Sequence, residues 1–139
     1  VYIKEMNKKD YNFGNEMENN LLEKINKHFN TTLQHTSKWC SWDYNNDDYL
    51  MELKTRRCNH NTYPTTMIGM NKIDILLKRV ETTILLFNFK DGLYFFTLDN
   101  DTIKDCETNQ NGGRADRGCN EYKSSGYCYI PFRLLTKIG

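Results

Sequence analysis

Two neighbouring apolar runs constrain the fold more than any other feature of this sequence. Residues 83–89 and 93–98 are rich in leucine and phenylalanine, and Lys90-Asp91-Gly92 lies between them. This pattern predicts a β-hairpin, because glycine tolerates the backbone angles that a tight turn requires. Both runs are apolar enough to be central strands, so other elements must cover both faces of the sheet that contains them.

Two further segments have apolar residues at the three-to-four-residue spacing of an amphipathic helix. In residues 15–29 these are Met17, Leu21, Leu22, Ile25 and Phe29, and in residues 67–80 they are Met70, Ile73, Leu76, Leu77 and Val80. The second segment contains Gly69, which disfavours a helix without excluding one. We therefore expect one helix before the first strands and another before the apolar hairpin.

The other segments predict short strands and loops. Residues 39–43 and 49–57 flank the turn-forming residues 45–48 and predict another hairpin. The remaining predictions are a brief strand at 127–130 that ends at Pro131, a closing helical turn at 132–138 and a Gly- and Asn-rich loop at 107–118. The resulting order is α-β-β-α-β-β, followed by a short strand and a helix. It indicates an α/β fold with a mixed four-to-five-stranded sheet flanked by helices.

The length and composition indicate the kind of molecule. With 139 residues and a net charge of +1, we expect a single domain over residues 1–139 and only a local site for any polyanion. No apolar run approaches the ~18 residues needed to cross a bilayer, so we expect no membrane partner. Five scattered cysteines and the lack of a basic-then-apolar N-terminal segment favour an intracellular location. Many asparagines and a single alanine suggest an AT-rich genome, such as that of a large DNA virus or an AT-rich microbe. For a viral protein, the expected location is the cytoplasm or nucleus of the host cell, or a viral factory.

The segment from Asp43 to Arg56 contains the most informative polar residues. Alternation along a strand puts Glu52, Lys54 and Arg56 on one face, about 6 to 7 Å apart in succession. If the hairpin loop consists of residues 46–49, Asp43 lies opposite Glu52, with roughly 5 Å between their Cβ atoms. A two-residue loop also keeps the two acids on one face, whereas a three-residue loop separates them.

Two carboxylates and an ammonium group at this spacing favour metal-dependent chemistry. Oxygen ligands from Asp43 and Glu52 suit Mg²⁺ or Mn²⁺, and Lys54 would orient an attacking water or help to deprotonate it. The reaction would be phosphodiester hydrolysis. Asp48 is the rival acid, although about 13 Å of strand separates it from Glu52. Structural alternatives are an Asx-turn at Asp43 and a solvated ion pair between Glu52 and Lys54.

These residues resemble the motif of the PD-(D/E)XK nuclease superfamily. The motif has an acid at the end of one strand, Glu-x-Lys nine residues later on the next strand and an acidic helix before both. The resemblance covers residues 15–98 and implies a restriction-endonuclease-like core. It assigns Asp43 and Glu52 as metal ligands and Lys54 as a catalytic residue. Ser41-Trp42 stands before Asp43, where proline is typical of the family.

The same resemblance implies auxiliary residues. An acid on the first helix often completes the family's site, and Glu16, Glu18 and Glu23 compete for that role. The spacing of Gly14, the acids and the apolar residues is similar to that in phage and resolvase-type members, and this favours Glu18 as a catalytic and metal-binding residue. Lys72 is similar to the polar helix residues that contact the scissile phosphate in the family.

The charge distribution indicates where a nucleic acid would bind. Residues 52–79 contain six basic residues and two acidic ones, a local excess of four in a chain of net charge +1. Arginine makes bidentate contacts with phosphate, so we expect Arg56, Arg57 and Lys72 to bind the nucleic-acid backbone. Arg114 and Arg117, in the polar loop, are expected to join them.

The sequence therefore predicts an Mg²⁺- or Mn²⁺-dependent endonuclease or exonuclease that acts on DNA in preference to RNA. A homodimer is left open, because many nucleases of this type act as dimers. The alternatives are an RNA endonuclease and a non-catalytic module on the same fold that binds nucleic acid or serves in assembly. Sequence specificity, cut polarity and biological pathway also stay open at this stage.

Overall fold

The computed structural model describes residues 19–109 and 126–138, and it divides the chain into two compact units, Val1–Leu33 and Gln34–Gly139. In the first unit, residues 19–29 are helical, as the apolar spacing predicted. The helix closes with a Schellman motif, in which Asn30 takes a φ of 52°. The N–H groups of Thr31 and Asn30 donate to the carbonyl groups of Asn26 and Lys27 at 3.0 and 3.4 Å.

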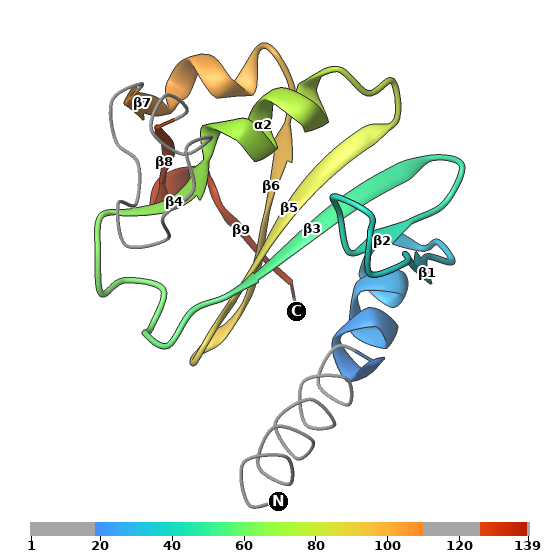
Figure 1. Ribbon diagram of the computed structural model, residues 1–139. Helices are drawn as coiled ribbons and strands as arrows, with labels where there is room; N and C mark the ends of the chain where they lie inside the picture. The colour runs from blue at the N-terminus through green and yellow to red at the C-terminus, as the bar shows by residue number, and fades with distance from the viewer. Residues whose placement is uncertain (1–18, 110–125, 139) are drawn as a thin grey trace, which may run out of the picture. The chain divides into compact units, whose positions relative to one another are not determined.

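The second unit contains a six-stranded mixed sheet and a second sheet of three strands (Figure 1). The six strands, in spatial order, are β1 (Gln34–His35), β2 (Tyr44–Asn45), β3 (Tyr49–Thr55), β5 (Thr82–Phe89), β6 (Gly92–Leu98) and β9 (Thr136–Ile138). The smaller sheet has the order β4 (Thr65–Gly69), β8 (Tyr127–Pro131) and β7 (Glu107–Asn109). The described helices of this unit are α2 (Met70–Leu77) and the short 3₁₀ helices η1 (Thr102–Asp105) and η4 (Phe132–Leu134). The prediction of an α/β fold with a mixed sheet is confirmed, but the sheet has six strands instead of the predicted four to five, because the short strands β1, β2 and β9 extend it.

Strand β3 is an inner strand of the large sheet. It pairs antiparallel with β2 on one side and parallel with β5 on the other. The parallel pairing follows from the intervening chain, because β4 and α2 carry the chain from the end of β3 back to the start of β5. The whole of β3 is therefore held by the ladder with β5, and its residues Leu50 and Met51 are also held by the ladder with β2.

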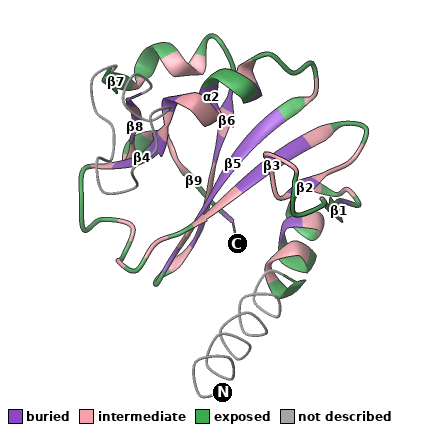
Figure 2. Cartoon of the chain, in the orientation of Figure 1, coloured by how far each residue is buried: buried purple, intermediate pink, exposed green. Residues whose placement is uncertain are grey.

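Strand β5 is buried on both faces, which explains its continuous apolar sequence. The face with Leu85, Phe87 and Phe89 packs against α2 and the smaller sheet, while Ile84 and Leu86 point to the other face and are also buried. Figure 2 shows this burial along the middle of β5. The helix α2 contributes Met70, Ile73 and Leu76 to the same core, and the smaller sheet contributes Ile68, Cys128 and Ile130.

Four predicted elements differ from the structure. Residues 67–69 belong to β4, so the predicted helix begins only at Met70, and Gly69 is its N-cap. The strand predicted at 39–43 is wrong, because the chain enters its ladder with β2 at Tyr44. The predicted closing helix at 132–138 is a 3₁₀ turn followed by β9. The predicted loop at 107–118 begins with β7, and its remainder from residue 110 lies outside the described residues.

Within the described part of the chain, no helix has the length and apolar character needed to span a bilayer.

Candidate active site

The hairpin of β2 and β3 sets the position of the two candidate acids. Tyr44 pairs with Met51 and Asn45 with Leu50, so the loop consists of residues 46–49. The Asn46 side chain shapes this loop, because its Oδ1 accepts the N–H groups of Asp48 and Tyr49 at 2.9 and 2.8 Å. This is the four-residue loop that was predicted to bring Asp43 opposite Glu52.

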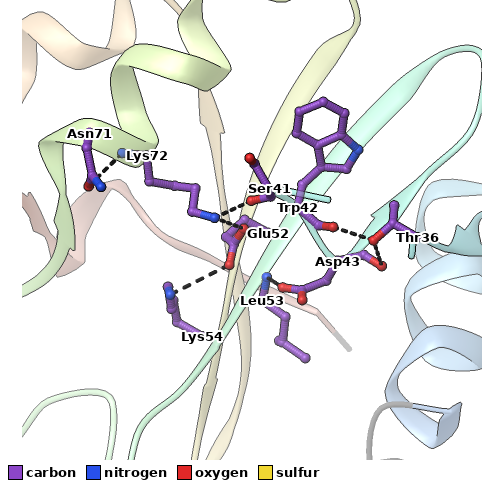
Figure 3. Close-up of polar contacts among 9 residues, drawn as sticks. All are labelled: Thr36, Ser41, Trp42, Asp43, Glu52, Leu53, Lys54, Asn71 and Lys72. Carbon is purple, nitrogen blue, oxygen red and sulfur yellow. Dashed lines mark hydrogen bonds and ion pairs between the residues drawn. The ribbon is translucent and has the colours of Figure 1, made fainter. Parts of the chain in front are cut away.

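Two hydrogen bonds join Asp43 to β3, one to the residue before Glu52 and one to the residue after it. The Asp43 backbone N–H donates to the Met51 carbonyl at 3.0 Å, and its carboxylate Oδ2 accepts the Leu53 N–H at 2.8 Å. Thr36 fixes the other edge of the segment, because its N–H and Oγ1 both donate to the Asp43 carbonyl at 3.1 Å. The Thr36 hydroxyl also donates to the Trp42 carbonyl (Figure 3). The Asp43 carboxylate therefore has a defined position beside Glu52.

Glu52 is a buried carboxylate between two ammonium groups and a second acid (Figure 3). Its residue surface is only 5% exposed. Lys54 Nζ lies 3.6 Å from Oε1, and Lys72 Nζ lies 3.3 Å from Oε2. Among the described residues, the buried Oε2 atom accepts no hydrogen bond, so its contact with Lys72 is an ion pair without hydrogen-bond geometry.

Burial and the neighbouring acid perturb the titration of Glu52. Loss of solvent on burial raises its pKa, and the negative charge of Asp43 raises it further. The positive charges of Lys72 and Lys54 oppose this rise, and the resulting pKa is about 7, against an ordinary value of 4.5. A carboxyl group with such a pKa on an inner strand is typical of a functional site.

Lys72 comes from the first turn of α2 and reaches across to the strands. Besides contacting Glu52, its ammonium group donates to the carbonyl of Ser41, two residues before Asp43. The side chain therefore joins α2 to the segment that carries one acid and to the strand that carries the other. The sequence predicts that Lys72 contacts the scissile phosphate. In the structure its ammonium group contacts Glu52, a contact that the sequence did not predict.

Trp42 and Arg79 form a second contact beside this site that the sequence did not predict. The Arg79 guanidinium carbon lies 5.3 Å from the centre of the Trp42 ring. Its Nε and Nη2 atoms donate to the two carboxylate oxygens of Glu81 at 3.1 Å each. The stacking of a cation on an aromatic ring holds the indole in place. The unusual Ser41-Trp42 before Asp43 was the only signal in the sequence for this contact.

The other predicted site residues are placed differently. Arg56 extends the line of Glu52 and Lys54 but binds β4, where its Nε donates to Thr66 Oγ1 at 3.4 Å and its Nη2 donates to the Met67 carbonyl. Arg57 is exposed. Three residues lie outside the described part of the chain: Glu18, Arg114 and Arg117.

The arrangement supplies two acids for a cation. In the described ranges 19–109 and 126–138, no three His, Cys, Asp or Glu residues come together as a metal-binding group. Asp43 and Glu52 nevertheless fit a hard divalent cation, because both present carboxylate oxygens, the buried Oε2 accepts no hydrogen bond, and such ions keep several waters in their shell.

Comparison with models of protein families identifies a family for this chain. The model of a family described as "Phage putative PDDEXK endonuclease" matches residues 7–138 of the chain. This range includes Asp43, Glu52, Lys54 and Lys72. No curated protein and no solved structure matches the chain.

Proposed function

The chain belongs to the phage PDDEXK endonuclease family, and from that premise we propose that it hydrolyses phosphodiester bonds of DNA at Asp43, Glu52 and Lys54, with Mg²⁺ or Mn²⁺ bound. The observation that carries this proposal is the buried Glu52 carboxylate, which an inner strand holds between Asp43 and two ammonium groups. A buried acid with a raised pKa costs stability, so its retention on a central strand favours a chemical role.

Asp43 and Glu52 would hold the cation. When bound, the cation supplies a water of lowered pKa and offsets negative charge on the phosphoryl oxygens. Lys54 and Lys72 favour the ionised form of Glu52, which is the form that binds a cation. Both ammonium groups lower the pKa of the Glu52 carboxyl group, whereas burial raises it. Glu18 is proposed as the auxiliary acid, in keeping with the family pattern.

Lys54 would position the attacking water. Its side chain is about a third exposed, at 37%, while its ammonium group lies against Glu52, so it can contact both the acid and a molecule arriving from solvent. A hydrogen bond from Nζ to the water oxygen would orient that oxygen toward phosphorus. The oxygen then bonds to phosphorus as the bridging P–O bond breaks, and the water's proton passes to solvent or to the leaving oxygen.

The basic residues around the site would bind the nucleic-acid backbone. Arg57 is exposed in the connection after β3, next to Arg56, so it is proposed as a phosphate contact. Arg114 and Arg117 keep the same proposed role. Lys72 is proposed to offset the charge of Glu52 before the cation arrives and to approach phosphate afterwards. We also propose an intracellular site of action, where a phage nuclease meets its substrate.

The proposal is tested by titrating Mn²⁺ into the wild type and into an Asp43→Asn, Glu52→Gln double variant by calorimetry. These substitutions keep the side-chain size while removing both negative charges. A gel assay on single- and double-stranded DNA and RNA is run in parallel. We expect the variant to lose Mn²⁺ binding and cleavage together. Cleavage by the double variant at the wild-type rate would contradict the proposal.

The same assay separates the alternatives. Preference for RNA would indicate the RNA endonuclease. Binding of nucleic acid by the wild type without Mn²⁺ binding or cleavage would indicate the non-catalytic module.

A further inference from the structure

A pocket of about 400 Å³ opens between the end of β3 and the smaller sheet. Volumes of this order are typical of small-molecule sites, which are mostly apolar and have a few fixed polar groups. The residues that matter for its chemistry are Arg56, Tyr63, Met67, Phe89, Tyr129 and Phe132. Four of these six are aromatic, so the pocket presents flat apolar surfaces on several sides.

One cation is fixed in the wall of this pocket. The Arg56 guanidinium is anchored to β4 through Thr66 Oγ1 and the Met67 carbonyl, and it lies 5.9 Å from the centre of the Phe87 ring. Its position therefore does not depend on a ligand. A planar cation beside aromatic walls is complementary to a flat heteroaromatic ring that is attached to an anionic group.

Two large, mainly apolar side chains at the rim of the pocket are exposed to solvent. Tyr63 is 62% exposed and Met67 is 41% exposed. Tyr63 lies in the connection between β3 and β4, and Met67 lies on β4. Exposed large side chains beside a concave apolar surface are typical of a binding site. The hydroxyl and the ring of Tyr63 can serve a ligand that has both polar and flat apolar parts.

The pocket is aligned with the proposed active site. Arg56 continues the face of β3 that carries Glu52 and Lys54, and four strand residues span about 13 Å. The same face of the large sheet packs against α2 and the smaller sheet, which supply the other pocket wall. A flexible strand with one phosphate at Lys54 would therefore place a neighbouring nucleotide at the pocket.

We propose that this pocket takes one unpaired nucleobase of the nucleic-acid strand that is cut at Asp43, Glu52 and Lys54. The base stacks on the aromatic walls, and Arg56 faces its sugar and phosphate. This inference rests on the proposed nuclease function and narrows its substrate. The strand must be single-stranded, or opened from its duplex, at the nucleotide that enters the pocket, because a base must leave its pair and its stack before it can enter a pocket.

Binding measurements without metal test the pocket apart from cleavage. Fluorescence anisotropy in EDTA follows a short labelled DNA strand in which a single abasic nucleotide is moved from one end to the other. We expect the wild type to lose affinity about tenfold when the abasic nucleotide falls at one particular position. Tyr63→Ala should bind the intact strand about tenfold more weakly and should show no further loss at that position.

The exposed position of Tyr63 makes this variant suitable, because its replacement removes little from the core. Val80→Ala is the matched control, since Val80 is 96% exposed in a different connection and should bind like the wild type. The same series made in RNA shows whether the pocket accepts the base from either backbone.

The outcomes are separable from those of the proposed function. If the wild type binds and cuts but no abasic position stands out, or if Tyr63→Ala keeps the position-specific loss, the base pocket is refuted while the nuclease assignment stands. If the wild type neither binds nor cuts any of the strands, the nuclease assignment fails and the base pocket fails with it.

Discussion

At the scale of the residue, Glu52 carries most of the chemistry. A carboxylate that is 5% exposed would ordinarily be protonated or paired. Here two lysines oppose the effect of burial and hold the pKa of Glu52 at about 7, so that the group can ionise near neutral pH. The negative charge of Asp43 has the opposite effect to the lysines, because it repels a negative charge on Glu52 and raises the Glu52 pKa. A bound cation would offset this repulsion, since it attracts both carboxylates.

The raised pKa of Glu52 predicts a specific dependence of stability on pH. Between its usual pKa of 4.5 and the folded value of about 7, the folded protein holds a proton that the unfolded chain has released. The free energy of unfolding must therefore fall as the pH rises through this window, by about 3 kcal/mol at most. Glu52→Gln cannot titrate and should lack this fall.

Urea denaturation of both proteins in EDTA, from pH 4.5 to 8, measures the effect. The test is the difference between the two curves, because the groups remote from Glu52 have the same surroundings in both proteins. Parallel curves would mean that Glu52 titrates normally and that the site is more hydrated than its burial indicates.

Lys54 is expected to act on the reaction and not on folding. Lys54→Ala should lower the cleavage rate by a factor of about 100 or more, the usual effect of removing a group that assists proton transfer. At pH 5, where Glu52 is protonated and its ion pair with Lys54 is absent, the urea midpoint should stay close to wild type, because the Lys54 side chain is 37% exposed. Single-turnover cleavage with Mn²⁺ measures the rate. Lys78→Ala, at the exposed end of α2, is the control, and an unchanged rate in Lys54→Ala would exclude Lys54 from the mechanism.

At the scale of the element, local patterns predicted more than distant pairings did. The hairpins of β2 with β3 and of β5 with β6 follow from nearby turn residues, so both could be predicted from the sequence. The register at Glu52 could not, because the turn residues allow loops of two, three or four residues, and only the structure selects the four-residue loop that puts Asp43 opposite Glu52. Strand β4 could not, because its partner β8 lies about sixty residues later and its Thr-Thr-Met-Ile sequence precedes a helix directly. The position of Lys72 against Glu52 depends on that packing, so this contact could not be predicted from the sequence.

The helix α2 is predicted to depend on Lys72 for its attachment to the site. Lys72→Met keeps much of the side-chain length but removes the contacts with Glu52 and the Ser41 carbonyl. At pH 8 the variant should lose about 1 to 3 kcal/mol of unfolding free energy, because a buried carboxylate loses a partner. At pH 5 the loss should be smaller, since Glu52 is then protonated.

Urea denaturation at the two pH values checks this prediction. Lys78→Met serves as the control on the same helix, since Lys78 is exposed at the C-cap. An equal loss of stability at both pH values would show that Lys72 contributes by packing alone and not through its charge.

At the scale of the whole molecule, a net charge of +1 makes the distribution of charge decisive. We expect the local excess of positive charge between residues 52 and 79 to contribute to nucleic-acid binding, together with Arg114 and Arg117, and some of the cations in residues 52–79 are already engaged. Arg79 is held by both carboxylate oxygens of Glu81, while Arg57 is exposed in the connection after β3. The two arginines should therefore differ in their contribution to binding.

The salt dependence of binding distinguishes them. Arg57→Ala should reduce the slope of log affinity against log salt for a single strand by about 0.7, the value expected for one lost phosphate contact. Arg79→Ala removes the same charge and should leave the slope almost unchanged. Anisotropy titrations at several salt concentrations in EDTA measure both slopes. If Arg79→Ala changed the slope more than Arg57→Ala, the nucleic acid would bind beside Trp42, which Arg79 contacts.

The inner position of β3 also bears on how such a protein can change over evolutionary time. The ladder with β5 holds the backbone of Glu52 and Lys54, and Asp43 binds Met51 and Leu53 on the other side, so a local shift of the chain cannot easily absorb a substitution there. The segments that enter and leave this hairpin, residues 36–43 and 56–64, are only partly bound to a sheet. New substrate preferences can therefore arise by drift in these two connections, while the reaction itself stays fixed by the strand between them.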